Sequence, residues 1–587
     1  MTPYSFLETN LQALKMRNTA IFRWIAAQEP SPRDLDSSLF TNRWGLLDWR
    51  LPSGKGLFDP IPPGMLYAEW IPREKADTSA TLIVGCNLGY GINHVLSNTS
   101  QTHKVLVLEP RQEMLLACLS QTDYRPFFES KKLFFVPPDV AFLHRVVWQL
   151  NLQYMFGNIF VRPDIPSRQL GPEYAVWTDQ WKEILEGLSV EMNTLGARQN
   201  IMIGNELKNF ARAMGDGSLL PLKNQGVGLS AVTLGAGPSL AKFVPLLAQD
   251  PGDALYTCGL QTLPALQPHG LKPHLCLAID HTMSMKRVYD RLDLEWARDI
   301  PLIYSCKLAP EVLRAYPGPT LPMWTLGGLG ACMPGDREVV LDAGGNVGVA
   351  LTRFLIWCGV SQILLVGQDF AWQGEKTHAA GHLADKNRFH FDSKRHIEMK
   401  NRYGETIYSS PAYTTALRDL EKDLKRSKVP VFNLYGGGAI IKGSKEAICT
   451  QVFQKGLLSS APGSLEHFVG TLEQARSPRP WPVFEARSPR WASSVHSVQK
   501  RLEKLFKKTK KHQKEIHTTL SQILFFLQQD SFYRPYLFNE ILGLAGLVRA
   551  RQTYSLKEKA ECKQVLRQVI RKVREMDQYL AYNKRAA

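Results

Sequence analysis

The sequence lacks any hydrophobic run of the roughly 18 residues that a membrane-spanning helix needs. Its N-terminus has no basic segment followed by an apolar stretch, so we expect no secretory signal. The nine cysteines stand singly, without a C-x-x-C pair, and their number is odd. These absences argue against a membrane span, a disulfide framework and a zinc site, and they predict a protein that stays in the cytoplasm.

The length of the chain limits the number of domains, and its net charge limits the kind of partner. A chain of 587 residues exceeds the size at which single hydrophobic cores stop growing, about 250–300 residues, so two to four domains are expected. The formal net charge of +17 favours acidic partners such as nucleic acid, anionic lipid or a negatively charged substrate. It does not choose between them, and a basic solvated surface explains it equally well.

The chain divides by pattern into an N-terminal Rossmann-like region, a helical connector, a central α/β region, a Pro-rich linker and a C-terminal helical region. The first contains apolar runs at 81–84 and 104–108 with a glycine turn between them, which is typical of a βαβ unit. The predicted bounds of the five regions are 1–172, 173–225, 226–474, 475–491 and 492–587.

In the central region strand-like runs alternate with helical stretches. This alternation predicts a mostly parallel sheet with helices on both faces. The runs are 231–234, 254–258, 275–279, 302–305, 362–366 and 429–433.

The strongest local signal is the glycine turn after the run 231–234. Gly235 and Gly237 let the backbone turn tightly and approach a ligand, Pro238 suits a first helical turn, and Ser239 supplies a hydroxyl or a cap. Free N–H groups at such a helix start favour an anion, and phosphate is the natural guest. A purely structural strand-to-helix turn is the alternative.

Further polar residues follow other predicted strands or begin another helix. Because ligands bind outside the carboxyl ends of parallel strands, we expect these positions to converge on one edge of the sheet. Each acid has an alternative role as an N-cap or turn residue. The positions are Asp280, Gly344, Gly345, Asn346, Gln368 and Asp369.

A loop rich in glycine and alanine carries His378 and His382. Histidine is the side chain most easily poised as a base near neutral pH. For each of them, and for His390 and His396, a surface or structural role is the alternative.

Together these segments resemble the central domain of the motility accessory factor (Maf) family of flagellin glycosyltransferases. The flanking regions resemble the family more weakly. The matching pieces occur in the family order and are GAGPSL at 235–240, HGLKPHLCLAID at 269–280, AGGNVGVAL at 343–351, ILLVGQDFAW at 363–372, KTHAAG at 376–381 and FNLYGGGAIIKG at 432–443.

The resemblance implies transfer of a nonulosonic acid, a sialic-acid-like sugar, from its CMP-activated form to serine or threonine of flagellin, in support of flagellum assembly and motility. The domain is also similar to bacterial sialyltransferases that use CMP-sialic acid. By that likeness the turn at 235–239 lines the CMP site, Asp280 replaces a nucleotide-contacting asparagine, and Asn346 replaces a serine. Ala236 and Gly259 stand where two other asparagines would be.

The implied chemistry is a single displacement that inverts the anomeric carbon while CMP leaves. We expect His378, or second His382, to deprotonate the acceptor hydroxyl. Tyr304, Lys376 and Arg388 are further candidates for stabilising the leaving phosphate. We expect no metal in the chemical step and no tightly bound cofactor, the CMP-sugar being a substrate.

Other interpretations stay open. The same domain occurs in 6-hydroxymethylpterin diphosphokinases, which use ATP and magnesium. The turn at 85–91, with Glu109 after the next strand, resembles an S-adenosylmethionine site, although a structural domain is the better interpretation. The lysines at 507–514 could bind nucleic acid, but aromatics are few there, so we do not expect it. We expect the C-terminal helices to hold flagellin instead. The sequence does not predict the oligomeric state.

Overall fold

The computed structural model describes residues 6–27, 38–71, 79–101, 103–150, 158–332, 338–393, 395–480, 484–508, 512–530, 533–550 and 554–582. The chain divides into two compact units. The first comprises Met1–Asn193, Val498–Phe525 and Glu540–Val565, and the second comprises Thr194–Ser497, Phe526–Asn539 and Leu566–Ala587.

The first unit is built on a parallel four-stranded sheet in the order β5-β4-β3-β6. Both strands that flank the first glycine turn lie where the apolar runs predict them. The elements are α1 (Leu7–Arg17), α2 (Thr19–Ala26), β1 (Leu39–Thr41), β2 (Leu47–Trp49), α4 (Pro63–Leu66), η1 (Ala68–Trp70), β3 (Ala80–Val84), α5 (Tyr90–Asn98), β4 (Lys104–Leu108), α6 (Gln112–Gln121), α7 (Arg125–Glu129), β5 (Leu133–Val136), α8 (Val140–Gln149), β6 (Ile159–Pro163) and η3 (Ser167–Gln169).

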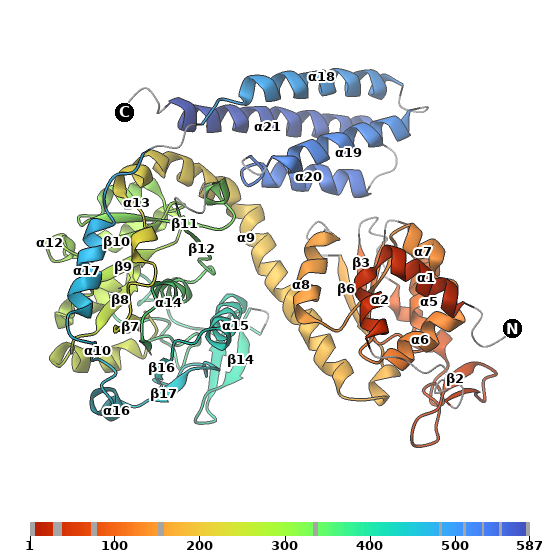
Figure 1. Ribbon diagram of the computed structural model, residues 1–587, viewed down its shortest axis with the longest axis horizontal. Helices are drawn as coiled ribbons and strands as arrows, with labels where there is room; N and C mark the ends of the chain where they lie inside the picture. The colour runs from red at the N-terminus through yellow and green to blue at the C-terminus, as the bar shows by residue number, and fades with distance from the viewer. Residues whose placement is uncertain are drawn as a thin grey trace. The chain divides into compact units, whose positions relative to one another are not determined.

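The second unit contains a nine-stranded parallel sheet in the order β12-β11-β10-β9-β8-β7-β13-β16-β17, and the labels β10, β9, β8 and β7 follow one another down the sheet in Figure 1. The predicted α/β class is confirmed. The strands are β7 (Ser230–Leu234), β8 (Leu255–Gly259), β9 (Leu275–Ala278), β10 (Leu302–Ser305), β11 (Thr320–Thr325), β12 (Val340–Leu341), β13 (Gln362–Val366), β16 (Val431–Leu434) and β17 (Lys445–Ala447), besides a separate hairpin of β14 (Ile397–Lys400) and β15 (Thr406–Ser409).

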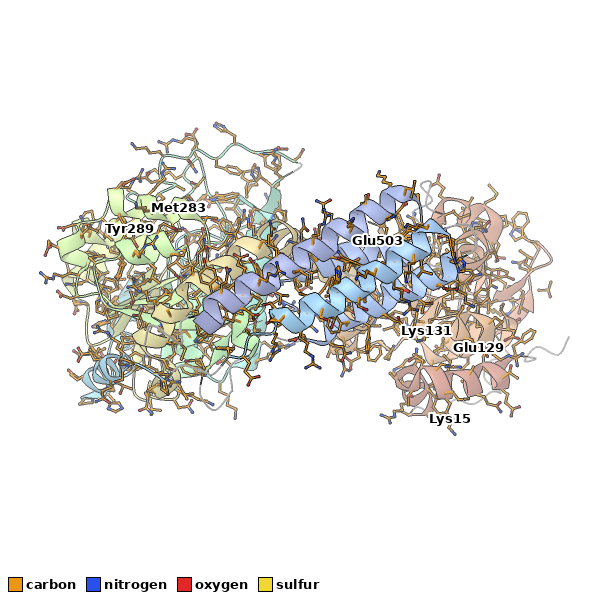
Figure 2. All side chains as sticks on the ribbon, turned by 90° about the horizontal axis from the view of Figure 1, so that it is seen from above. Lys15, Glu129, Lys131, Met283, Tyr289 and Glu503 are labelled. Atoms are coloured by element: carbon orange, nitrogen blue, oxygen red, sulfur yellow. The ribbon has the colours of Figure 1, made fainter. Side chains whose placement is uncertain are left out.

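Helices cover both faces of this sheet, because its central strands are apolar on both sides and must be buried on both. α10 (Leu240–Gln249) packs in one apolar core, whereas α14 (Val347–Cys358) and α15 (Pro411–Arg426) pack in the other. The remaining elements are η4 (Leu220–Leu222), η5 (Leu260–Thr262), α11 (Leu263–Leu266), η6 (Gln267–His269), η7 (Met283–Asp290), α12 (Leu294–Ala297), α13 (Pro310–Ala315), η8 (Leu329–Cys332), α16 (Cys449–Gln454) and α17 (Ser464–Gln474). Figure 2 labels Met283 and Tyr289 on η7.

Long helices complete the chain. α9 runs from Glu173 to Asp216 and contributes to both units, and the helices after the Pro-rich segment are also shared between them. The last helix of the chain buries Val569, Val573, Met576 and Leu580, which recur at spacings of three or four residues along one face. No helix in the described ranges is both long and apolar enough to cross a bilayer. The helices are α18 (Ser488–Lys507), α19 (Gln513–Gln529), α20 (Phe538–Ala550) and α21 (Leu556–Tyr582).

Candidate functional site

The candidate site lies where the strand order of the large sheet reverses. From β7 the chain adds β8 to β12 on one side, and then returns to place β13 on the other side of β7. In parallel sheets such a reversal opens a crevice outside the carboxyl ends of the strands. The turn at 235–239 follows β7 and the segment 367–369 follows β13, so both predicted segments stand at this point.

The turn after β7 is closed onto Asp369. The Ser239 amide donates to Asp369 Oδ2 at 2.9 Å, and its hydroxyl donates to Oδ1 at 2.5 Å. A Cβ at Gly237 would lie 2.3 Å from Asp369 Oδ2, so only glycine leaves room for the carboxylate. Burial raises the pKa of Asp369, and the two bonds from Ser239 oppose that shift. Ser239 and Asp369 therefore hold one another, and the serine hydroxyl is not free for phosphate.

The second glycine turn, at the start of α14, is capped by its own asparagine. Asn346 Oδ1 accepts from the amides of Gly348 at 2.9 Å and Val349 at 3.3 Å, which is the ordinary role of asparagine before a helix. Gly344 and Gly345 both have positive φ, of 60° and 67°. No protein acceptor among the described residues meets the amides of Gly345, Asn346 and Val347. These three amides are the donors that remain for an anion.

Gln368 brings the two glycine turns together. A Cβ at Gly235 would lie 2.7 Å from its Nε2, and a Cβ at Gly348 would lie 2.3 Å from its Oε1. The Gln368 side chain therefore stands between the turn after β7 and the first turn of α14. Its Nε2 is buried and has no acceptor among the described residues. A buried amide without a partner is costly, so Gln368 is suited to donate to a ligand.

Asp280 follows β9, two strands away from β7. At a strand spacing of ~4.8 Å this places it about 10 Å along the same edge. Its Oδ1 accepts the amide of Thr282 at 2.9 Å, the turn role that was the alternative interpretation. The side chain is 39% exposed and remains accessible to a ligand.

The histidine loop packs against the turn at 235–239. The Ala379 amide donates to the carbonyl of Ala236 at 3.0 Å, so His378 and the turn at 235–239 are fixed relative to one another. The rings of His378 and His382 stack with centroids 4.1 Å apart and planes 9° apart. Two stacked imidazoles disfavour positive charge on either ring.

His382 has both ring nitrogens engaged. Its Nδ1 accepts the Ala384 amide at 3.1 Å, which assigns the proton to Nε2, and Nε2 lies 3.1 Å from Gln261 Oε1. Burial, reinforced by the neighbouring His378, lowers the pKa of His382 to about 3. The ring is a neutral structural link with no free lone pair.

His378 has the opposite tautomer. Its Nδ1 lies 3.1 Å from Thr377 Oγ1, and that hydroxyl donates to the Ala384 carbonyl at 3.1 Å, so the proton resides on Nδ1. The lone pair is on Nε2, where it accepts from the hydroxyl of Tyr413 on α15 in a long hydrogen bond of 3.4 Å. Burial lowers the pKa of His378 and keeps it neutral. Of the two histidines, His378 is the one with the form of a general base.

Of the three further candidates for stabilising a leaving phosphate, one is buried in the sheet and two are exposed on the histidine loop. Tyr304 is fully buried, and its hydroxyl donates to Asp216 at 3.1 Å, away from the strand ends. Lys376 and Arg388 are exposed on two paired segments of the histidine loop. Sequence reasoning missed Tyr413, because nothing in an amphipathic helix indicates that one of its tyrosines reaches a loop 35 residues earlier.

The glycine turn of the first unit is filled by its own side chains. Glu109, the acid in the resemblance to an S-adenosylmethionine site, accepts from the Cys86 amide at 2.7 Å and from the Tyr174 hydroxyl at 2.6 Å. Burial raises its pKa to about 7. Asn87 donates to Asp164 at 3.0 Å across the neighbouring strand end. This arrangement favours the structural interpretation of the unit over a methyltransferase site.

Comparison with known proteins agrees with this architecture. The family model described as 6-hydroxymethylpterin diphosphokinase MptE-like matches residues 204–375. The chain is similar to the structure of a Maf glycosyltransferase from Magnetospirillum magneticum AMB-1, with a TM-score of 0.64, 15% sequence identity and coverage of 98% of this chain and 96% of that chain. No curated protein matches. The resemblance to the Maf family is confirmed at the level of the fold, and it extends over nearly the whole chain.

Proposed function

We propose that the protein is a glycosyltransferase that moves a nonulosonic acid from its CMP-activated form to serine or threonine hydroxyls of flagellin. The observation that carries the proposal is a neutral His378, with its lone pair on Nε2, held by the Ala379–Ala236 hydrogen bond beside the glycine turn at the strand-order reversal. The base thus stands beside the turn at 235–239, and Gln368 links that turn to the start of α14.

The donor's phosphate is proposed to lie at the start of α14. The amides of Gly345, Asn346 and Val347 and the side chain of Gln368 supply hydrogen bonds there. Donors of this kind stabilise the charge that develops on a leaving phosphate. Asp280, farther along the edge, is proposed to contact the nucleoside. The turn at 235–239 shapes the site through its backbone, because Ser239 is committed to Asp369.

In the reaction His378 Nε2 takes the proton of the acceptor hydroxyl. The hydroxyl oxygen forms the new bond to the anomeric carbon, and the bond from that carbon to the phosphate oxygen breaks. Its electron pair leaves with CMP, and the configuration inverts. We propose that the step needs no metal.

Intact-mass measurement of flagellin from cells with and without this protein tests the proposal. We expect a mass difference of one or more nonulosonate units. Unchanged flagellin mass would refute the assignment of the acceptor and the reaction together.

A diphosphokinase is the second candidate, favoured by the family match over 204–375. Thermal melting with CMP, and separately with ATP and magnesium, distinguishes the two activities. Stabilisation by CMP alone supports sugar transfer, and stabilisation by ATP with magnesium alone supports the kinase.

A further inference from the structure

A row of aromatic rings connects His378 to the protein surface. It starts at the hydroxyl that meets His378 Nε2, and centroids of successive rings are 5.3, 5.0, 5.2 and 4.8 Å apart. Contacts this close are favourable packing between aromatic side chains. From the base outward, this aromatic row consists of Tyr413, Trp372, Phe389, Tyr408 and Phe391.

The backbone fixes the row. Trp372 and Tyr408 exchange hydrogen bonds, from the amide of Trp372 at 2.6 Å and from the amide of Tyr408 at 3.0 Å. The hairpin of β14 and β15 thereby joins the strand end that carries the site, and Figure 1 shows β14 beside α15. His396 is part of this framework, since its Nδ1 accepts the Asp392 amide at 2.9 Å.

The outer end of the row is open to solvent. Phe391 is 50% exposed, so one large aromatic ring at the end of the row is available to a partner. Exposed aromatic rings of this kind often act as anchors in protein–protein contacts. Strand β14 pairs only with β15 among the described strands, so its outer edge, on the side of β15 away from Trp372, can accept a further extended chain.

We propose that the aromatic row and the β14 edge bind the acceptor polypeptide in extended form, an inference that rests on the proposed function. The acceptor hydroxyl must come within hydrogen-bond reach of His378 Nε2. The Ala379 side of the loop faces the glycine turn, and the other side faces Tyr413. An extended chain advances ~3.3 Å per residue, so side chains that flank the modified residue meet successive rings.

A strand edge favours a polypeptide over a sugar. Its unpaired amides and carbonyls have the same spacing as the backbone groups of another extended chain. This placement differs from the expectation that the C-terminal helices hold flagellin. Phe525 on α19 offers a matched control, since it is an equally large apolar side chain, 63% exposed.

The test uses the full chain with monomeric flagellin. Binding without donor, transfer with CMP-nonulosonate, and hydrolysis of that donor without flagellin are measured for the wild type, Phe391→Ala, Phe391→Tyr and Phe525→Ala. We expect Phe391→Ala to raise both the flagellin Kd and the flagellin KM roughly five- to tenfold, as loss of an aromatic anchor does. Phe391→Tyr should restore both, and Phe525→Ala should match the wild type.

Equal flagellin affinities of Phe391→Ala and Phe525→Ala would overturn the docking surface, even if transfer itself occurs. A change confined to the donor KM in hydrolysis would overturn it as well, since the rings would then bind the sugar. Wild-type protein that binds flagellin through Phe391 but transfers no sugar would leave the surface standing and remove the proposed function. Absence of flagellin binding by the wild type would remove the docking surface.

Discussion

Gly237→Ala tests the Ser239–Asp369 clasp, by which we mean the two hydrogen bonds that hold the turn after β7 against the segment after β13. The added Cβ would lie 2.3 Å from Asp369 Oδ2 and 2.7 Å from the carbonyl oxygen of Gly367. The Asp369 side chain can rotate away from the added methyl group, whereas the Gly367 carbonyl can move only with its backbone, so we expect the carboxylate to be displaced. Both hydrogen bonds from Ser239 are then lost.

Each hydrogen bond to a charged group contributes ~1.5–3 kcal/mol. Hydration of the released carboxylate recovers part of that, because burial raises its pKa and so disfavours its charged form in the native site. We therefore expect Gly237→Ala to lower the free energy of unfolding by about 3 kcal/mol. The melting temperature of the second unit should fall by roughly 6–12 °C, at ~2–4 °C per kcal/mol.

Differential scanning calorimetry measures this shift, and Gly204→Ala is the matched control. Gly204 lies in α9 with no heavy atom within 4 Å of its added Cβ. Alanine in a helix is favoured over glycine by up to ~1 kcal/mol, so the control should melt at or above the wild-type temperature. Melting of Gly237→Ala within about 2 °C of the control would refute the clasp.

The other predictions concern the base and the second turn. His378→Gln should lower kcat ~10²–10⁴-fold, whereas His382→Gln should stay within about tenfold of wild type; equal losses in single-turnover assays would contradict the assignment. Because burial lowers the pKa of His378, the basic form is lost only as pH falls below its ordinary value of 6.5, so kcat/KM should have its acid limb under that pH and His378→Gln should lack it. A limb above 6.5 would count against His378. Asn346→Ala removes the cap of α14 and should cost ~1 kcal/mol in calorimetry; an unchanged melting temperature would show that the cap contributes nothing.

The strands could be predicted where short apolar runs end in glycine or polar residues, as at β7 and β13. Strand β11 was not predicted, because Pro322 interrupts its run of strand-forming residues. The proline is tolerated there because β12 pairs only with Trp324 and Thr325, which leaves the edge beside Pro322 open. β6 and the β14–β15 hairpin were also missed.

The positions that form the site could be predicted from the sequence, whereas several of the roles assigned to them differ in the structure. Asn346 at a helix start is a cap by ordinary preference, and that role was available from the sequence. The pairing of Ser239 with Asp369, 130 residues apart, could not be predicted from the sequence, because no local pattern encodes it. The same holds for Gln261, which is 121 residues from His382 and occupies its Nε2.

The stacked imidazoles bear on how the protein recovers between turnovers. With both nitrogens of His382 held, that ring cannot relay a proton onward from its neighbour. A proton collected by His378 at Nε2 must escape past the Tyr413 hydroxyl to bulk solvent. If that escape is slow, steady-state turnover will rise with the concentration of a small diffusible buffer, while a single catalytic event will not.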